Sequence, residues 1–242
     1  METFMIKKNN LKLGIIGGAG PLASSTLYRI FIQAAQQQYG AYEDRDFPEI
    51  IIINFPFSPM LSQQASTTNN QLISSELQTC FNQLATINVS HAVIACNTLH
   101  TFMHQINQHK ITLISLVQTV VITIQSYRNV LILGTEKMIK AELYTAQLIN
   151  TSSCSDQDQE TISTIIERVL RGEKTDLLAP VLAAYINRLS AASPIDAVIL
   201  GCTELSEINQ HSPLHNYLTN KNITIIDPLE LVVQAMLKVA YE

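Results

Sequence analysis

The chain has 242 residues, of which 47% are hydrophobic and 14% are charged, a composition typical of folded globular proteins and not of disordered ones. The formal net charge of -5 provides no basic face for nucleic acid. No apolar run approaches the roughly 20 residues that cross a bilayer, so we expect neither nucleic-acid nor membrane binding. Lys7 and Lys8 follow the apolar residues of the N-terminus instead of preceding them, which argues against a secretory signal and for a cytoplasmic protein.

The first predicted strand, residues 11–16, runs into the turn Gly17-Gly18-Ala19-Gly20-Pro21. A proline in the first turn suits the helix that we predict over residues 21–38. Glycines let a ligand approach the backbone, and the N-terminus of a helix attracts anions. Ala19 and Gly20 are therefore candidates for binding a small carboxylate.

A loose dinucleotide-binding pattern, G-x-G-x-x-A, covers Gly18 to Ala23. A dinucleotide site also needs an acid at the end of the second strand. The second predicted strand, residues 49–54, ends in Asn54 without one. The turn thus favours a small carboxylate over a nucleotide. Because no other phosphate or lysine-imine site is evident, we expect no cofactor.

Beyond the second strand, helical and extended patterns continue to alternate. Residues 56–68 are rich in Pro, Ser and Gln and are long enough to form a lid over a site. Residues 151–158 form the most polar connection. The remaining helices are predicted at residues 69–88, 98–109, 116–126, 134–149, 159–171, 174–191 and 229–241, and the remaining strands at residues 91–95, 111–115, 129–133, 196–200 and 223–226.

A faint internal repeat runs through this pattern. A similar segment occurs at residues 111–114 and again at residues 223–226, an offset of 112. Cysteines recur at residues 96 and 202, an offset of 106, and glycines that end a strand recur at residues 17 and 134, an offset of 117. Offsets this similar predict two related halves within an α/β fold, each a mostly parallel sheet flanked by helices.

The repeat also suggests how the chain divides. We expect a first α/β domain of residues 1–112 plus 213–242, with the last strand and helix returning to it, and a second α/β domain of residues 113–212. Ligands of parallel sheets bind beyond the carboxyl ends of the strands. We therefore expect the active site in the cleft between the two halves.

The four cysteines, Cys80, Cys96, Cys154 and Cys202, form no C-x-x-C pair, which excludes the simple zinc-ribbon and thioredoxin motifs. In a reducing compartment all four remain thiols. Cys80 falls in an apolar helical pattern and is interpreted as a packing residue, and Cys154 as an incidental loop residue. The histidines show no metal-ligand spacing with the cysteines, so no metal site is predicted.

Cys96 and Cys202 each follow a short apolar run and precede a helix start. Each thiol is expected at the carboxyl end of a strand, where the helix dipole and free N–H groups favour the thiolate. Two thiols on opposite sides of a carbon atom can remove a proton from one face and return a proton to the other. Short donors that can stabilise the carbanion through its carboxylate are Asn97, Thr98, Thr135 and Thr203.

Simpler interpretations of these residues stay open. Free cysteine is among the most buried residue types, so both thiols can be packing residues. Glu204 is a candidate general acid or partner for a substrate ammonium, and it also suits a helix start as a carboxylate. His100 is interpreted as capping or packing within its own helix.

The motifs Cys96-Asn97-Thr98-x-His100 and Gly201-Cys202-Thr203-Glu204, together with the glycine turn at residues 17–21, resemble the aspartate/glutamate racemase superfamily, particularly its aspartate racemases and broad-specificity amino-acid racemases. The resemblance implies a homodimer of two-domain α/β chains that racemises an amino acid without pyridoxal. It also implies that Cys96 and Cys202 are the acid–base thiols, and that Asn97, Thr98, Thr135 and Thr203 hold the carboxylate and amino group. Glutamate racemases have His at the position of Glu204, which favours the aspartate-like branch.

One departure concerns the side chain of the substrate. Relatives of the aspartate type have a basic residue in the loop after the second strand, which here reads Phe57-Ser58-Pro59-Met60-Leu61-Ser62. A second basic position is filled by Leu170, with Arg171 and Lys174 nearby. A buried carboxylate needs a basic partner. Because the basic residue of the relatives is absent from this loop, the substrate can be aspartate or a less acidic amino acid.

Two other functions also remain open on the same fold. One is isomerisation or decarboxylation of a small carboxylic acid, for which a single essential thiol suffices. The other is a protein that binds a small carboxylate without turnover, in which the cysteines only pack. The second cysteine strand favours racemisation over both.

Overall fold

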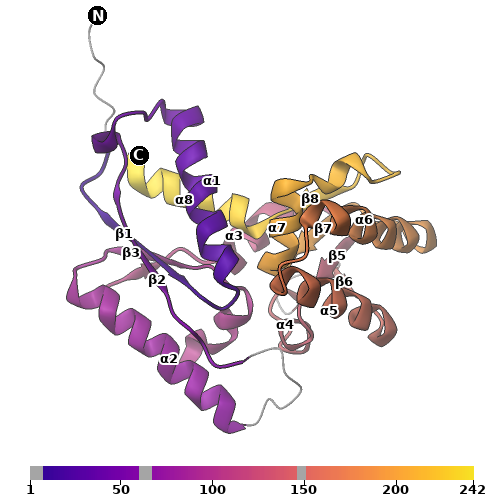
Figure 1. Cartoon of the computed structure of the whole chain (residues 1–242), viewed down its shortest axis with the longest axis horizontal. Coiled ribbons are helices and arrows are strands. Elements are labelled where there is room, and N and C mark those ends of the chain that lie inside the picture. The colour runs from indigo at the N-terminus through magenta and orange to yellow at the C-terminus, as the bar shows by residue number, and fades with distance from the viewer. Residues whose placement is uncertain (1–7, 60–66, 146–150) are drawn as a thin grey trace, which may run out of the picture. The chain divides into compact units, whose positions relative to one another are not determined.

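The computed structural model describes residues 8–59, 67–145 and 151–242. In these ranges the chain forms two four-stranded parallel sheets, with strand orders β2-β1-β3-β4 and β6-β5-β7-β8 (Figure 1). The chain divides into two compact units. The first comprises Met1–Ala95, Phe102–Leu116 and Leu229–Glu242, and the second comprises Cys96–Thr101 and Val117–Pro228. The predicted α/β architecture of two parallel sheets flanked by helices is confirmed.

The first unit places its sheet between two layers of helices. Its strands and long helices are β1 (Lys12–Gly17), β2 (Glu49–Asn54), β3 (His91–Ile94), β4 (Thr112–Leu113), α1 (Pro21–Tyr39), α2 (Thr67–Thr86) and α8 (Pro228–Tyr241). Figure 1 shows α1 and α8 on one face of the sheet and α2 on the other. Leu13 and Ile15 of β1 join the apolar cluster of α1 and α8, whereas Gly14 faces Leu84 of α2. The central strand is therefore apolar on both faces, as a buried parallel strand requires.

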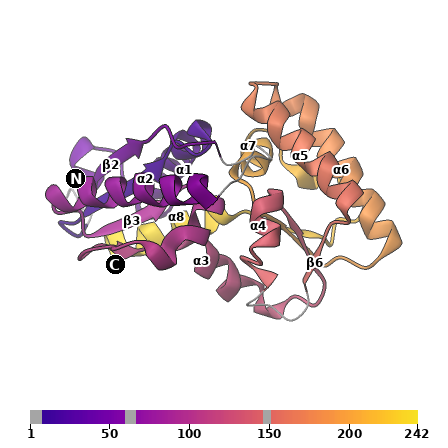
Figure 2. The ribbon, with the colours of Figure 1, turned by 90° about the horizontal axis from the view of Figure 1, so that it is seen from below.

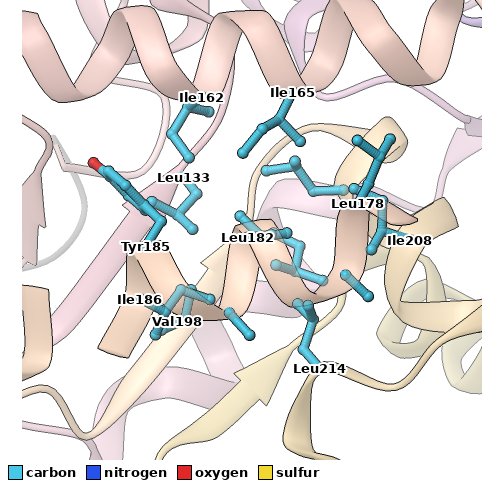
Figure 3. Close-up of a cluster of buried hydrophobic side chains, with 14 of the residues drawn as sticks. Leu133, Ile162, Ile165, Leu178, Leu182, Tyr185, Ile186, Val198, Ile208 and Leu214 are labelled. Carbon is cyan, nitrogen blue, oxygen red and sulfur yellow. The ribbon is translucent and has the colours of Figure 1, made fainter. Parts of the chain in front are cut away.

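The second unit repeats this plan with a larger helical layer. Its elements are β5 (Val130–Leu133), β6 (Thr151–Ser153), β7 (Ala197–Leu200), β8 (Thr224–Ile226), α3 (Leu116–Thr123), α4 (Glu136–Lys140), α5 (Asp156–Leu170), α6 (Thr175–Ala192) and α7 (Thr203–His211). Helices α5 and α6 run side by side (Figure 2). Ile162 and Ile165 of α5 meet Leu178 and Leu182 of α6 in one apolar cluster, which Leu133 of β5 also joins (Figure 3).

The register of the two sheets confirms the internal repeat. Ile16 of β1 pairs with Ile94 of β3, and Leu133 of β5 pairs with Leu200 of β7. These corresponding residues are 117 and 106 positions apart, the same offsets that the sequence shows. The carboxyl ends of β3 and β7 are thus equivalent places in the two units.

The division into units differs from the one expected from the sequence. Strand β8 pairs with β7, so residues 213–228 belong to the second unit, and only the last helix belongs to the first. Cys96–Thr101 also belongs to the second unit, although β3 immediately before it belongs to the first. The sequence could not show this, because the unit to which a short segment belongs depends on packing and not on its own pattern.

Three local predictions are wrong. Thr151–Ser153 is an edge strand and not part of a polar connection, because backbone bonding to β5 requires no apolar pattern. The helix after Cys96 is a 3-10 helix over Thr98–Gln105 and not an α-helix to residue 109. Helix α4 ends at Lys140 and not at residue 149, and Glu142 beyond it has a left-handed φ of 52°.

Other expectations concern residues outside the described ranges or are only partly covered by them. Residues 60–66 of the predicted lid and residues 146–150 of the predicted helix lie outside the described residues. The helix predicted at residues 174–191 is α6, which contains Pro180 within its length. No helix in the part of the chain that the structure describes is long and apolar enough to cross a membrane.

Candidate active site

Cys96 and Cys202 occupy corresponding positions, each two residues beyond the end of its strand. Cys96 follows Ile94 of β3, and the 3-10 helix begins at Thr98. Cys202 follows Leu200 of β7 and is the N-cap of α7. Both side chains are buried, at 6% and 7% exposure. The predicted placement of both thiols, at a strand end facing a helix start, is confirmed.

The electrostatic consequence expected from that placement is wrong. Burial raises the pKa of the Cys96 thiol to about 12 and raises the pKa of the Cys202 thiol well above its ordinary value. Backbone N–H groups of Thr98 and Leu99 act in the opposite direction on Cys96, but the loss of water around the thiolate outweighs them. Both thiols are therefore held in the protonated form in the folded chain.

The two thiols both belong to the second unit, and they are close enough for their charges to interact. A negative charge on Cys96 raises the pKa of Cys202, and the Glu204 carboxylate raises the pKa of Cys96. The two cysteines are 106 positions apart in the sequence, so only the fold brings them into reach of each other. The same fold places a carboxylate beside them.

Glu204 is bonded directly to one of the thiols. The Cys202 Sγ–H donates to Glu204 Oε2 across 2.8 Å, and the Thr203 hydroxyl donates to the same oxygen across 3.4 Å. Glu204 is only 7% exposed, and burial raises the pKa of its carboxyl group. A carboxylate with a raised pKa is a better proton acceptor, so Glu204 is placed to take the proton of Cys202.

Two buried threonines from distant segments meet near the thiols. The Thr98 and Thr135 hydroxyl groups are hydrogen bonded across 3.0 Å. Thr135 also caps α4, since its Oγ1 accepts from the backbone N–H of Met138 at 3.2 Å. This contact joins the segment after Cys96 to the carboxyl end of β5 inside the second unit.

Asn97 is held by a residue that the sequence did not single out. The Tyr144 hydroxyl donates to Asn97 Oδ1 across 2.5 Å, and both side chains are buried. Among the described residues, Asn97 Nδ2 has no hydrogen-bond partner. Tyr144 lies in the stretch predicted as a continuous helix, and no local signal marks a tyrosine whose hydroxyl reaches a residue 47 positions away.

His100 packs against its own segment, in agreement with the prediction. Its Nδ1–H donates to the backbone carbonyl of Cys96 across 2.9 Å. Burial lowers the pKa of His100 to about 4, so the ring is neutral near pH 7. Its Nε2 is therefore an acceptor, and no donor in the described part of the chain reaches it.

Ala19 and Gly20 belong to the first unit, on the turn after β1. Ala19 is buried, and Gly20 is the N-cap of α1 with a left-handed φ of 82°. Gly18 has φ +103°, and a Cβ there would lie 1.9 Å from the carbonyl oxygen of Phe55. Only glycine fits that position, so this turn is built around a close backbone approach.

The positions considered for binding an acidic side chain of the substrate offer few free cations. Arg171 is ion paired with Glu167 at 2.6 Å on the exposed side of α5, and Leu170 is 39% exposed. Lys174 is the N-cap of α6. In the loop after β2, Ser58 donates to Glu76 at 2.6 Å, and residues 60–62 lie outside the described residues.

Among the residues that the structure describes, no cluster of His, Cys, Asp and Glu fits a metal ion.

Comparison with known proteins shows which family carries this arrangement. The profile of the Asp/Glu/Hydantoin racemase family matches residues 16–236. The chain is 22% identical over 207 residues to the broad-specificity amino-acid racemase of Bacillus subtilis (strain 168), covering 82% of this chain and 88% of that protein.

Solved structures agree in fold. An aspartate racemase of Picrophilus torridus superimposes with a TM-score of 0.74 at 24% identity, covering 94% of this chain and 93% of that one. An aspartate racemase homologue from Pyrococcus horikoshii OT3 gives a TM-score of 0.68 at 22% identity, covering 96% and 99%. With nearly the whole chain matched by the family profile, the chain belongs to the Asp/Glu/hydantoin racemase family.

Proposed function

We propose that the protein is a cofactor-independent amino-acid racemase in which Cys96 and Cys202 exchange the roles of base and acid. The observation that carries the proposal is the equivalent placement of these two buried thiols, two residues beyond equivalent strands and within electrostatic reach of each other. A reaction that inverts a carbon atom needs one proton-transfer group on each face of that carbon.

The chemistry balances with these two groups alone. The thiolate of one cysteine removes the α-proton, and the electron pair of the broken C–H bond is spread into the substrate carboxylate. The thiol of the other cysteine then donates its proton to the opposite face of the α-carbon. One turnover leaves the first cysteine protonated and the second ionised, ready to act on the other enantiomer.

Ionisation of a thiol must first overcome the burial that raises its pKa. An amino-acid substrate brings an ammonium group, and a positive charge close to a thiol lowers the thiol pKa. Glu204 supplies a second route, because its Oε2 already accepts a hydrogen bond from the Cys202 thiol. The substrate itself and Glu204 would thus activate thiols that the folded chain keeps protonated.

The substrate carboxylate would be held by short donors beside the thiols. Asn97, Thr98, Thr135 and Thr203 are buried side chains of the second unit. Donors fixed in a dry site stabilise the charge that develops on the carboxylate when the α-proton leaves. We extend the proposal to small amino acids, including aspartate, with the D-enantiomer as a product.

The finer parts of the proposal come from the family resemblance, which implies the homodimer, and from the charge and apolar pattern of the sequence. We propose a cytoplasmic homodimer that binds neither nucleic acid nor membrane. Analytical ultracentrifugation of the purified chain checks the dimer, since a species of one chain mass across the concentration range would contradict it.

The racemase proposal is tested with single L-amino acids incubated with the protein in deuterated buffer. Deuteration of the α-carbon is followed by NMR, and the loss of optical rotation is followed in the same sample. Exchange of the α-proton together with racemisation supports the proposal. A ligand that binds without exchange would show a carboxylate-binding protein, and a product of different structure would show a related isomerase or decarboxylase.

A further inference from the structure

The contact between Tyr144 and Asn97 fixes which end of the Asn97 amide is bound to the protein. The Tyr144 hydroxyl oxygen lies 2.5 Å from Asn97 Oδ1. An amide oxygen can only accept a hydrogen bond, so the tyrosine hydroxyl is the donor. Burial raises the pKa of Tyr144, so its hydroxyl stays protonated and remains a donor.

At the other end of the Asn97 amide, the Nδ2 atom has no hydrogen-bond partner among the described residues. Asn97 is 2% exposed, and no acceptor among the described residues reaches its Nδ2. A buried N–H group without an acceptor costs free energy, and native proteins retain few such groups without a reason. The position of Asn97 gives the reason, because it follows Cys96 directly in the sequence.

We infer that Tyr144 is a positioning residue, which holds the Asn97 amide with its NH₂ group directed to the carboxylate of the substrate. The inference rests on the proposed function for the identity of the ligand. With Oδ1 held by Tyr144, the free end of the Asn97 amide is its NH₂ group, which donates to a carboxylate oxygen. Tyr144 thereby acts on the substrate through Asn97 and touches no reacting atom.

Tyr144→Phe tests this role, since it removes the hydroxyl and keeps the ring that fills the core. The amide of Asn97 is then free to turn, and we expect kcat/KM for racemisation to fall roughly 10-fold or more. Tyr185→Phe is the matched control. Tyr185 is another buried tyrosine of the second unit, at the edge of the core cluster with its hydroxyl directed away from it (Figure 3). A loss in Tyr144→Phe no larger than in this control would overturn the inference.

A double-mutant cycle separates positioning from general stabilisation. Asn97→Ala removes the donor, so adding Tyr144→Phe to it should cost no further activity if Tyr144 acts only through Asn97. Losses that add in the double variant would show that Tyr144 supports the core independently, and would refute the inference.

The orientation of the amide can also be read without turnover. In the ¹H–¹⁵N spectrum, the Asn97 side-chain NH₂ pair is identified by its disappearance in Asn97→Ala. We expect this pair to shift in Tyr144→Phe and to stay in place in Tyr185→Phe. An unchanged pair in Tyr144→Phe overturns the inference even if the protein racemises no amino acid, an outcome that would refute the proposed function by itself.

Discussion

The Cys202 thiol donates its hydrogen to Glu204 Oε2 across 2.8 Å, two residues further along the same chain. The first turn of α7 makes this possible, because Cys202 is the N-cap and Glu204 lies within that turn. The carboxylate acts on the thiol in two opposed ways. Its negative charge raises the thiol pKa, and its Oε2 atom can accept the thiol proton.

Glu204→Gln separates these two effects. Without the negative charge, the pKa of Cys202 should fall, while racemisation slows because the neighbouring proton acceptor is gone. Alkylation of Cys202 by iodoacetamide, followed by peptide mass spectrometry across pH, reports the pKa. Glu207→Gln removes the same charge one helical turn later and serves as the control. Racemisation that accelerates in step with the thiolate fraction would contradict a proton-accepting role for Glu204.

Serine at either thiol position should stop racemisation. Cys96→Ser and Cys202→Ser each replace a thiol by a much weaker acid of similar shape, and we expect the rate in both directions to fall roughly 100-fold or more. Cys154→Ser, a half-buried cysteine on the edge-strand side of the second sheet, should retain activity. Circular dichroism and a urea titration check that each variant folds. Full activity in either of the first two variants would refute the two-thiol mechanism.

His100 makes the stability of the protein depend on pH. The unfolded chain protonates this ring below a pKa near 6.5, whereas the folded chain does not until pH falls to about 4. In that window the unfolded state binds the extra proton, so the free energy of unfolding falls as pH is lowered from 6.5 to 4 and is unaffected by this group below 4. The full contribution is on the order of 3 kcal/mol.

Urea denaturation at several pH values between 4 and 7 measures this effect. His100→Asn keeps a donor for the Cys96 carbonyl but cannot be protonated, so its stability should change less across the same range. Parallel pH dependence in the wild type and His100→Asn would show that other groups cause the loss.

Thr135→Val should destabilise the second unit, because it removes the cap of α4 and the hydroxyl that Thr98 bonds. We expect the free energy of unfolding to fall by about 1–3 kcal/mol. Thr135→Ser keeps the hydroxyl and should retain most of the stability. The urea midpoint at constant slope reports the difference. Equal midpoints for the Val and Ser variants would show that the hydroxyl contributes nothing.

Gly18→Ala should damage the first unit. The new Cβ would lie 1.9 Å from a backbone oxygen at a φ of +103°, so we expect a loss of about 3 kcal/mol or more. Gly40→Ala is the control, since Gly40 also has a left-handed φ of +70° but has open space around an added Cβ. It should cost about 1–2 kcal/mol, from backbone strain alone. Thermal unfolding compares the two, and equal losses would contradict a steric cause at Gly18.

Most of the fold can be predicted from the sequence because the two units repeat the same arrangement of strands. The paired residues Ile16 and Ile94 of the first sheet recur as Leu133 and Leu200 of the second, at the offsets visible in the sequence, so local patterns place both thiols just beyond a strand. Local patterns carry that information, since an apolar run followed by a small polar residue marks a strand end and a helix start.

What the sequence could not supply depends on packing. The sequence predicts a lowered thiol pKa, because the helix starts are visible in it and the burial that outweighs them is not. The bond from Tyr144 to Asn97 joins residues 47 positions apart, beyond the reach of any local pattern. The sequence also does not identify the basic residue that would pair with the side-chain carboxylate of an acidic substrate, since a side chain from any segment of the chain can supply this charge.

The membership of Cys96–Thr101 in the second unit sets an order of events during synthesis. A nascent chain that has grown just past residue 101 carries Cys96, but Thr135, Tyr144 and Cys202 have not yet been made. Ribosomes add about 5–20 residues each second, so the 101 residues from there to Cys202 take roughly 5–20 s. Throughout that interval the growing chain holds Cys96 without Cys202, so under the proposed mechanism an abandoned translation product would lack the second proton-transfer group and would not interconvert the enantiomers of the free amino acids around it.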